Sequence, residues 1–231
     1  MNRIKSLLLS IASGCLLSLP WMTSSFSWVL LLAFIPLLWA EELLYRLRDT
    51  QPGYRMLFNS LVAFLTWNIL STWWIAYVSL AGMLAIAFIN AFLMACCWWI
   101  MHALRRKAGS STASFALAVT WIAFETLHFH WTIQWPWLTL GNGFASAPHW
   151  VQWYELTGVT GGSLWILLVN MLLFSVVKSY RNTRFQNILQ PLIWLLLLVI
   201  VPAGGSLYRY MTYTEKGETR EGALLQPNGD P

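Results

Sequence analysis

The sequence predicts an all-α integral membrane protein with about seven transmembrane helices, an interfacial aromatic loop and a short carboxyl-terminal tail. Hydrophobic residues make up 58% of the 231 positions and charged residues only 10%, whereas a soluble domain has a charged share of roughly 25%. The apolar residues form runs close to the roughly 20 positions that a helix needs to cross a bilayer core. Lysine and arginine gather between alternate runs, which is typical of cytoplasmic loops.

The apolar runs predict the spanning helices one by one. We expect them at Ile4 to Leu19, Phe26 to Leu44, Met56 to Val78, Ala81 to Leu104, Thr112 to Leu127, Val159 to Val177 and Ile188 to Leu207. The first and fifth runs are short, and Pro36 interrupts the second, so tilted or kinked helices are expected there.

The first run has a second interpretation. Arg3 and Lys5 precede an apolar stretch that ends at Cys15, as in a lipoprotein signal peptide. However, Ala12 occupies a position where a large aliphatic residue is usual, and more membrane segments follow. We therefore interpret this run as an uncleaved first helix.

The basic residues predict the orientation, because cytoplasmic loops carry the excess of lysine and arginine. With a cytoplasmic amino terminus and seven crossings, eleven of the fourteen basic residues are cytoplasmic. These are Arg3, Lys5, Arg46, Arg48, Arg55, Arg105, Arg106, Lys107, Lys178, Arg181 and Arg184. The remaining three, Arg209, Lys216 and Arg220, follow the seventh run, so the carboxyl terminus is expected in the periplasm.

The segment between Lys107 and Lys178 is the most unusual part of the sequence. It has no lysine or arginine over seventy residues, yet it holds seven of the sixteen tryptophans. Prolines and glycines between His128 and Gly162 prevent one continuous spanning helix. Because tryptophan favours the bilayer interface, we expect an aromatic loop on the periplasmic surface.

The stretch from Trp131 to Gly143 is the first candidate site within this loop. Its aromatic rings flank a proline and two glycines that permit tight turns. Trp and Leu side chains could line a groove for acyl chains, while Gln134, Asn142 and backbone amides meet a polar headgroup or ester. An ordinary aromatic belt is the alternative interpretation.

Two carboxylates accompany the loop. Glu125 lies near the outer end of the fifth predicted helix, and a carboxylate inside a membrane is a functional candidate because its burial is costly. A structural role, accepting a hydrogen bond from a neighbouring Trp or His, is the alternative. Glu155 is expected on a short surface helix with its aromatic neighbours facing lipid and the acid facing water. Asn90 and Asn170, inside apolar runs, predict interhelical hydrogen bonds.

Several classes of function are disfavoured. The basic residues lie in short scattered clusters and form no face for nucleic acid. Cys15, Cys96 and Cys97 all lie within apolar runs, so no disulfide framework follows. No pair of histidines has the i, i+4 spacing of a helical metal site, and no cofactor is expected.

The tail changes character after residue 208. We divide the chain into a membrane domain, 1–208, and a periplasmic tail, 209–231. Within the tail, the apolar stretch from Ala223 to Gln226 precedes Pro and Asn, which is typical of one strand entering a turn. Because a single strand is not stable alone, the tail is interpreted as the start of a soluble domain.

Four motifs resemble one known family, the bacterial apolipoprotein N-acyltransferases. They are WIAFE at 121–125, WPWLTLGNGF at 135–144, WYELTGV with two further glycines at 153–162, and ALLQPN at 223–228. The second is similar to versions from the Bacteroidetes, and the fourth is similar to the first strand of the family's nitrilase-like domain. The resemblance is most specific in these segments, while the other helices match in number and length.

The resemblance implies a reaction and its partners. In this family an acyl chain passes from a phospholipid to a cysteine and then to the amino-terminal diacylglyceryl-cysteine of a lipoprotein, at the bacterial inner membrane. The expected substrate-contacting residues of this chain are Glu125, Gln134, Trp135, Pro136, Trp137, Gly141, Asn142, Trp153 and Glu155. No metal or cofactor is implied.

The chain also departs from the family. The family's Glu, Lys and Cys triad lies in the nitrilase-like domain, beyond the strand at 223–228, and no residue here takes a triad position. We therefore expect this chain alone to be inactive, with a separately encoded nitrilase-like domain as one partner that would complete it. A non-catalytic lipid-binding scaffold and a small transporter subunit stay open as alternatives.

Overall fold

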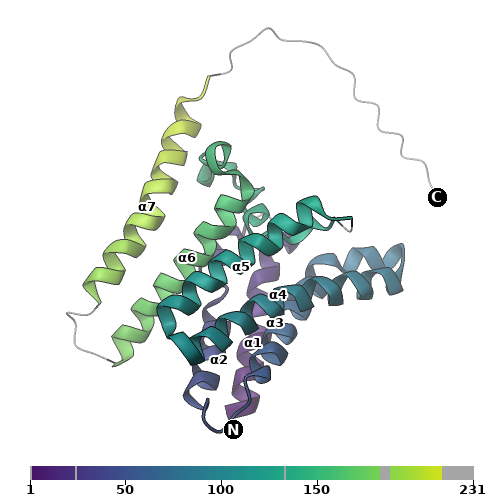
Figure 1. The fold of residues 1–231 in the computed structure, drawn as a ribbon. Helices are drawn as coiled ribbons and strands as arrows, with labels where there is room; N and C mark the ends of the chain where they lie inside the picture. The colour runs from purple at the N-terminus through teal and green to yellow at the C-terminus, as the bar shows by residue number, and fades with distance from the viewer. Residues whose placement is uncertain (1, 24, 133, 183–187, 215–231) are drawn as a thin grey trace.

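The computed structural model describes residues 2–23, 25–132, 134–182 and 188–214. Their regular secondary structure consists of helices, and they contain no β-strand (Figure 1). The all-α prediction is therefore confirmed for these residues. Their seven α-helices are α1 (Asn2–Met22), α2 (Ile35–Arg46), α3 (Tyr54–Thr72), α4 (Leu80–Ala108), α5 (Ser110–His130), α6 (Tyr154–Asn182) and α7 (Leu189–Thr212). Five 3-10 turns join them: η1 (Ser27–Leu31), η2 (Trp73–Tyr77), η3 (Pro136–Leu138), η4 (Leu140–Phe144) and η5 (Pro148–Trp150).

Each predicted run coincides with helix, and five segments are long and apolar enough to cross a membrane. These five are Arg3–Met22, Ser27–Arg46, Leu80–Ala108, Tyr154–Tyr180 and Leu189–Thr212. Helices α3 and α5 lie outside this set and carry more polar side chains. In α3 the polar side chains Asn59, Asn68 and Thr72 are buried against other helices. A polar helix can therefore lie inside the bundle without exposing its polar groups to lipid.

Two of the long apolar segments are not continuous helices, and each is interrupted near a proline or a glycine. The second segment begins as η1, turns, and continues as α2 with Pro36 in the first helical turn, where its missing N–H costs no hydrogen bond. Helix α6 is interrupted at Gly158, whose φ of 67° is readily adopted only by glycine. The kink expected at Pro36 is therefore present, and a second one separates the first turn of α6 from its long part.

Four large aromatic side chains form the centre of the core. Phe34, between η1 and α2, packs its ring 5.4 Å from Trp98 of α4 and 5.7 Å from Trp121 of α5. Phe64 of α3 lies 5.5 Å from Trp121. All four rings are almost completely buried. Four helices thus converge on one aromatic cluster, and Trp121 connects it directly to Glu125.

Two buried asparagine side chains form hydrogen bonds between helices. Asn90 of α4 donates to Asn68 Oδ1 of α3 at 2.8 Å. Asn170 of α6 accepts from the Phe34 amide at 2.9 Å and donates to the Leu30 carbonyl at 2.7 Å, which satisfies backbone groups at the break before α2. The predicted interhelical bonds of Asn90 and Asn170 are therefore confirmed.

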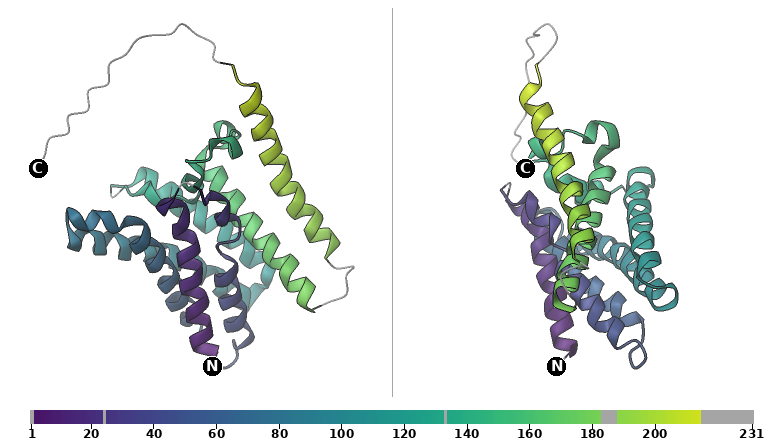
Figure 2. Two further views of the ribbon diagram at one scale, coloured as in Figure 1. Left: turned by 180° about the vertical axis from the view of Figure 1, so that it is seen from behind. Right: turned by 90° about the vertical axis from the view of Figure 1, so that its left-hand side faces the viewer.

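Helix α7 stands at the edge of the bundle (Figure 2). It packs on α6 and η5, and most of its apolar side chains, including Trp194 and Ile200, are exposed. It continues through Thr212, beyond the expected domain boundary at 208. The predicted strand at 223–228 lies outside the described residues.

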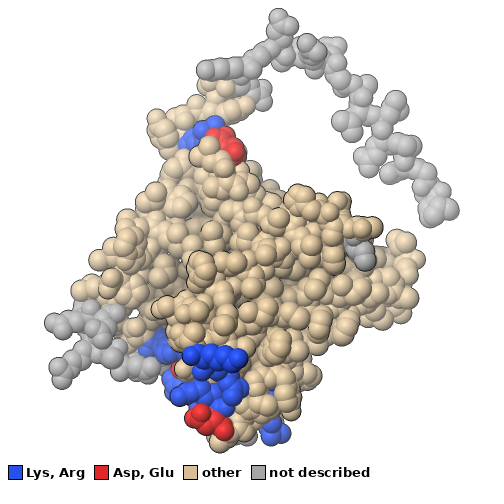
Figure 3. Space-filling view, in the orientation of Figure 1, with Lys and Arg blue, Asp and Glu red and all other residues tan. Residues whose placement is uncertain are grey.

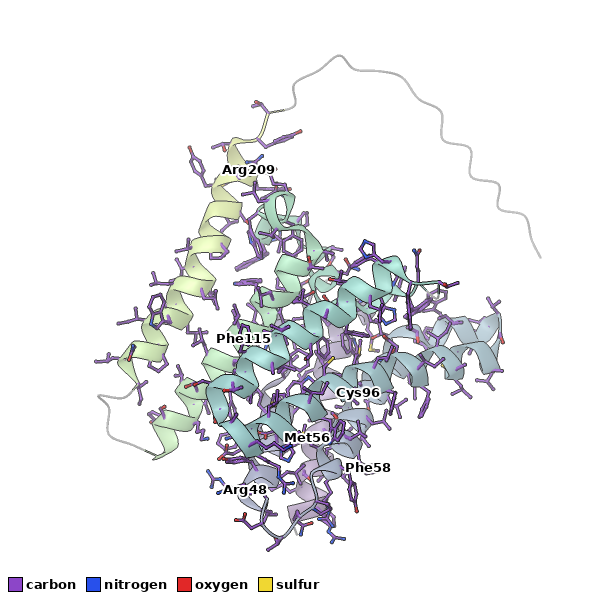
Figure 4. The ribbon with its side chains drawn as sticks, viewed as in Figure 1. Arg48, Met56, Phe58, Cys96, Phe115 and Arg209 are labelled. Carbon is purple, nitrogen blue, oxygen red and sulfur yellow. The ribbon has the colours of Figure 1, made fainter. Side chains whose placement is uncertain are left out.

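Charge divides the two ends of the molecule (Figure 3). Lysine and arginine gather where α2 joins α3 and α4 joins α5, and Arg48 marks this region in Figure 4; we name it the basic end. The opposite, aromatic end carries the 131–153 loop, where Arg209 forms an ion pair with Glu155. The distribution follows the asymmetry predicted from sequence.

Candidate functional site

The 131–153 loop joins α5 to α6 through the three short turns η3, η4 and η5. Its glycines and prolines prevent a regular helix, as the sequence predicts. The turns fold back onto α6 and onto the ends of α1 and η1, and η5 packs against α7. The loop is consequently packed against the helices at the aromatic end.

Glu125 is the anchor of this loop. Trp121, Glu125 and His128 are spaced by four and three residues, which places them on the inward face of α5. Glu125 Oε1 accepts from the Trp121 indole N–H and from the Leu140 amide, both at 2.9 Å. The side chain is only 2% exposed. The hydrogen bond from a neighbouring tryptophan, expected for a structural role, is therefore confirmed.

The second oxygen of this carboxyl group has a different environment. Glu125 Oε2 is buried without a hydrogen bond of normal geometry, although the Ser163 hydroxyl lies beside the carboxyl group. The nearest lysines in sequence are Lys107, in the last turn of α4, and Lys178, which is paired with Glu42 of α2 at the basic end. Glu125 is thus solvated by neutral N–H and O–H groups and has no ion-pair partner among the described residues.

Gly141 fixes the loop on α6. Its amide donates to Ser163 Oγ at 3.0 Å, and its carbonyl accepts from the Tyr154 hydroxyl at 3.2 Å. A Cβ at this position would collide with the backbone of Val159. Glycine is therefore required here for close approach of the loop to the start of α6.

The Pro136 carbonyl holds the two turns η3 and η4 together. It accepts from the Thr139 amide at 3.2 Å, from the Thr139 hydroxyl at 2.9 Å and from the Asn142 side-chain amide at 3.0 Å. Asn142 thus directs its amide nitrogen into the loop itself. Its role in the structure is to shape the turn, and only its other edge could meet a ligand.

Trp137 presents an aromatic ring at the edge of this frame. Its carbonyl accepts from the Trp21 indole at 3.2 Å, and its ring lies 5.8 Å from Trp74 of η2 in an edge-to-face arrangement. The Trp137 side chain is nevertheless 50% exposed. Because its backbone is held in place and its ring is accessible, Trp137 is suited to contact an apolar ligand.

The aromatic residues before α6 face the protein, which differs from the sequence expectation. Trp153 packs its ring 5.7 Å from Trp165 of α6 and 4.8 Å from Tyr154. Glu155 projects outward, to an ion pair with Arg209 of α7 at 2.6 Å, and Leu156 beside it is also exposed. The aromatics turn inward because the break at Gly158 lets the first turn of α6 fold over the helix that follows.

Gln134 and Trp135 lie at the periphery. The Gln134 side chain donates to the Phe129 carbonyl at 3.1 Å and so caps the last turn of α5. The Trp135 indole nitrogen is buried without a partner. Glu125, Pro136, Trp137, Gly141, Asn142 and Trp153 therefore share one packed frame, whereas Gln134 and Glu155 lie at its edges.

Four further residues of this frame were not predicted as site residues. Trp21 comes from the end of α1, more than one hundred residues away in sequence, and Trp74 comes from η2. Ser163 and Tyr154 both bind Gly141. The only sequence signal was the glycine-rich start of α6, which indicated close packing without identifying the partners.

His128 adds polar groups that the frame leaves free. Its ring lies between Phe124, at 4.8 Å, and Trp131, at 5.0 Å. Both of its nitrogens and the Trp131 indole nitrogen are buried and have no hydrogen-bond partner within the part of the chain that the structure describes. These groups can meet a polar ligand atom, whereas no group of three or more His, Cys, Asp or Glu residues in the described chain could hold a metal.

The cysteines lie away from this frame. Cys97 is buried between α4 and α5, with its thiol directed to the Leu93 and Thr120 carbonyls. Cys96 lies beside it in the middle of α4 (Figure 4), and Cys15 is on the exposed face of α1. The aromatic end thus offers ring surfaces and hydrogen-bond donors, and none of the three thiols.

Comparison with known proteins identifies the family. The family model for the apolipoprotein N-acyltransferase N-terminal domain matches residues 13–172. An apolipoprotein N-acyltransferase from Chlorobaculum tepidum is 24% identical over 235 residues, in an alignment that covers 98% of this chain and 42% of the relative. This chain therefore spans less than half of the length of that relative. The matched region includes α5, the loop and the start of α6, and it extends over more than half of the chain, which therefore belongs to the apolipoprotein N-acyltransferase N-terminal domain family.

Proposed function

We propose that this chain is the membrane part of an enzyme that transfers an acyl chain from a phospholipid to the amino-terminal diacylglyceryl-cysteine of lipoproteins. In this proposal the aromatic end presents the lipid substrates, and the expected contacts are Glu125, Gln134, Trp135, Pro136, Trp137, Gly141, Asn142, Trp153 and Glu155. The family match supports the reaction class. The observation that carries the site is the exposed Trp137 ring on a rigidly held backbone.

The orientation belongs to the same proposal. All seven helices cross the bacterial inner membrane, with the amino terminus in the cytoplasm and the aromatic end on the periplasmic leaflet. The concentration of lysine and arginine at the opposite end supports this orientation. The break at Gly158 and the loop before it then lie at the interface, where irregular backbone can be tolerated because it is packed in protein.

The chain by itself is proposed to be inactive in acyl transfer. A nucleophile is needed to accept the acyl chain, and the three thiols lie within α1 and α4, away from the loop. Catalysis would come from a nitrilase-like domain, either covalently joined or separately encoded. The membrane part would contribute binding and orientation of two lipid substrates, which can supply a large share of a rate enhancement.

A chimera tests the reaction. The matching segment of the Chlorobaculum tepidum enzyme is replaced by this chain, and the product is made in a bacterium depleted of its own acyltransferase. Mass spectrometry then measures the fraction of lipoprotein amino termini that carry a third acyl chain. We expect the chimera to restore triacylation and this chain alone to leave the termini diacylated. The intact relative is the positive control.

The outcomes separate the alternatives. A chimera that accumulates in the membrane at the level of the intact relative, and yet leaves lipoproteins diacylated, would favour a lipid-binding scaffold or a transporter subunit. Triacylation by this chain alone would contradict the proposed inactivity.

Trp137→Ala in the active chimera tests the site. We expect about fivefold slower appearance of triacylated termini, equivalent to ~1 kcal/mol of ring burial against an acyl chain. Trp194→Ala is the matched control, because Trp194 is an exposed tryptophan in the first turns of α7, whereas the ring contact of α7 with the loop is at Tyr210. Equal rates for the two variants would argue against Trp137 as a lipid contact.

A further inference from the structure

We infer that the groove between α5 and α6, together with the polar pocket at its basic end, binds one anionic phospholipid of the leaflet on that side. The polar pocket of this site lies at the basic end, away from the Trp137 frame, and the inference does not depend on the proposed acyl transfer. Three observations carry the inference: an apolar groove, a polar pocket that shares its lining, and a surplus of positive charge in that pocket.

The groove follows the outer side of α5. It has a volume of about 940 Å³ and is lined almost entirely by apolar side chains of α5 and α6, from Ser114 to His130 on α5. Phe115, at the lower part of α5 in Figure 4, is 72% exposed on its edge. Sixteen helical steps extend for about 24 Å, which exceeds half of the roughly 30 Å hydrocarbon core. The groove is therefore long enough for an acyl chain of one leaflet.

A polar pocket of about 180 Å³ continues the groove at the basic end. Ser114 and Met171 line both spaces, so the two are contiguous. The pocket adds the hydroxyl groups of Ser110 and Ser175 and the cations Arg105 and Lys178. An apolar channel that opens into hydroxyl groups and cations matches the order of acyl chain, ester and phosphate in a phospholipid.

The charges around this pocket are unequal. Glu41 and Glu42 are buried in α2, and Arg105 donates to both carboxylates. Glu42 also accepts from Arg46 at 2.9 Å and from Lys178 at 2.8 Å. The lysine and arginine side chains of this cluster, Arg46, Arg105 and Lys178, outnumber its two carboxylates by one.

Lys178 is the cation with capacity for a further partner. Its side chain is 33% exposed, and among the described residues its ammonium group donates one hydrogen bond, to Glu42. Two of its three N–H donors are therefore available. Arg105, in contrast, is 8% exposed and is bound to Glu41, Glu42 and Ser110. A phosphate at the pocket would meet Lys178 first, with the serine hydroxyls as additional donors.

The anion is assigned to a lipid because the pocket is joined to the groove. A free phosphate would use the cations and leave the apolar groove of about 940 Å³ unfilled. A zwitterionic lipid would fill the groove, but its own cation would compete for the two carboxylates. A net anionic headgroup, such as that of phosphatidylglycerol, satisfies both the surplus charge and the apolar groove.

Two variants and two matched controls test the site. Lys178→Gln removes the available cation, and Lys107→Gln removes an exposed cation of the same end that lies outside the pocket. Ala118→Phe fills the groove, and Ala85→Phe adds the same ring at an exposed position of α4. Each purified chain is titrated with phosphatidylglycerol, phosphatidylcholine or inorganic phosphate in detergent, and bound lipid is measured by native mass spectrometry.

We expect phosphatidylglycerol to bind more tightly than phosphatidylcholine. Lys178→Gln should weaken phosphatidylglycerol binding about fivefold and leave phosphatidylcholine unchanged, since one cation near an anionic headgroup contributes about that factor. Ala118→Phe should weaken binding of both lipids, and both control variants should behave as the unaltered chain. Circular dichroism without added lipid verifies that each variant is folded.

Three results would overturn the inference. Equal affinity for phosphatidylglycerol and phosphatidylcholine would show that the positive charge of the pocket does not select the headgroup. Undiminished lipid binding by Ala118→Phe would place the lipid outside the groove. Full competition by inorganic phosphate at the lipid's own affinity would show a free-anion site and not a phospholipid site.

Discussion

The two ends of the molecule bury carboxylates in opposite ways. At the aromatic end, Glu125 is surrounded by neutral donors, the Trp121 indole and the Leu140 amide. At the basic end, Glu41 and Glu42 are held by Arg105, with further cations around Glu42. The same residue type thus organises a loop at one end and cross-links helices at the other.

The two carboxylate environments differ because lysine and arginine are concentrated at the basic end of the molecule. The segment that holds Glu125 has no lysine or arginine of its own, and this buried carboxyl group is met by N–H groups that the fold directs inward. One of these donors, the Leu140 amide, belongs to the backbone of the loop, so the carboxyl group helps to set the loop's shape. At the basic end the cations are carried by long flexible side chains, which reach the carboxylates of α2 from helices far apart in the sequence.

Arg105→Ala is expected to have the largest effect. It would leave Glu41 and Glu42 buried without their shared partner, and breaking a buried pair from one side costs about 3–5 kcal/mol. The measurement is the free energy of unfolding in mixed micelles. Lys107→Ala, two residues along at an exposed position of the same helix, is the control and should change little. A small loss for Arg105→Ala would mean that His102 is a sufficient partner for Glu41, and Lys178 and Arg46 for Glu42.

Glu125→Ala is expected to be the next most severe. Two buried donors, the Trp121 indole and the Leu140 amide, would lose their acceptor, at a cost of about 2 kcal/mol. Limited proteolysis should then cleave the 131–153 loop faster than in the unaltered chain.

Glu125→Gln sharpens this prediction because it keeps an acceptor oxygen for both donors. The glutamine variant should retain most of the stability and of the protease resistance. If the two substitutions were equally damaging, the ionised form of Glu125 and not its acceptor geometry would be required, and the contrast with the basic end would weaken.

Ser163→Ala should have a smaller effect. It removes the acceptor of the Gly141 amide, and hydrogen bonds between membrane helices contribute about 1 kcal/mol or less. A lower thermal midpoint with unchanged helix content would agree with this. Ser206→Ala on α7, where the hydroxyl is buried without a partner, is the control and should be neutral.

Glu155→Gln should have the smallest effect. Its ion pair with Arg209 is exposed on both sides, with side-chain exposures of 44% and 53%, and such pairs contribute less than about 1 kcal/mol. Any loss should disappear in high salt, because exposed charges are screened. A loss that persisted in high salt would show that this pair holds α7 against the loop more firmly than its exposure indicates.

The packing around the candidate site was predicted in part, and the lipid contacts of its residues stay a prediction. Trp137, Gly141 and Trp153 were found from their pattern of rings, proline and glycine, and the structure brings them into one frame. Trp21 and Trp74 were missed because they come from other helices and carry no local signal of their role. The direction of Trp153 was wrong for a similar reason, since the break at Gly158 turns it toward α6.

The helices, the kink at Pro36 and the segregation of charge between the two ends could all be predicted from the amino-acid sequence. They follow from hydropathy, from backbone chemistry and from the cost of placing cations among apolar segments, all of which are local properties. The partners of each buried carboxyl group could not be predicted, because the Leu140 amide reaches Glu125 through the fold of the loop and the Arg105 guanidinium reaches Glu41 through the packing of α4 on α2. Periodicity identifies which face of a helix is buried, and packing selects what that face contacts.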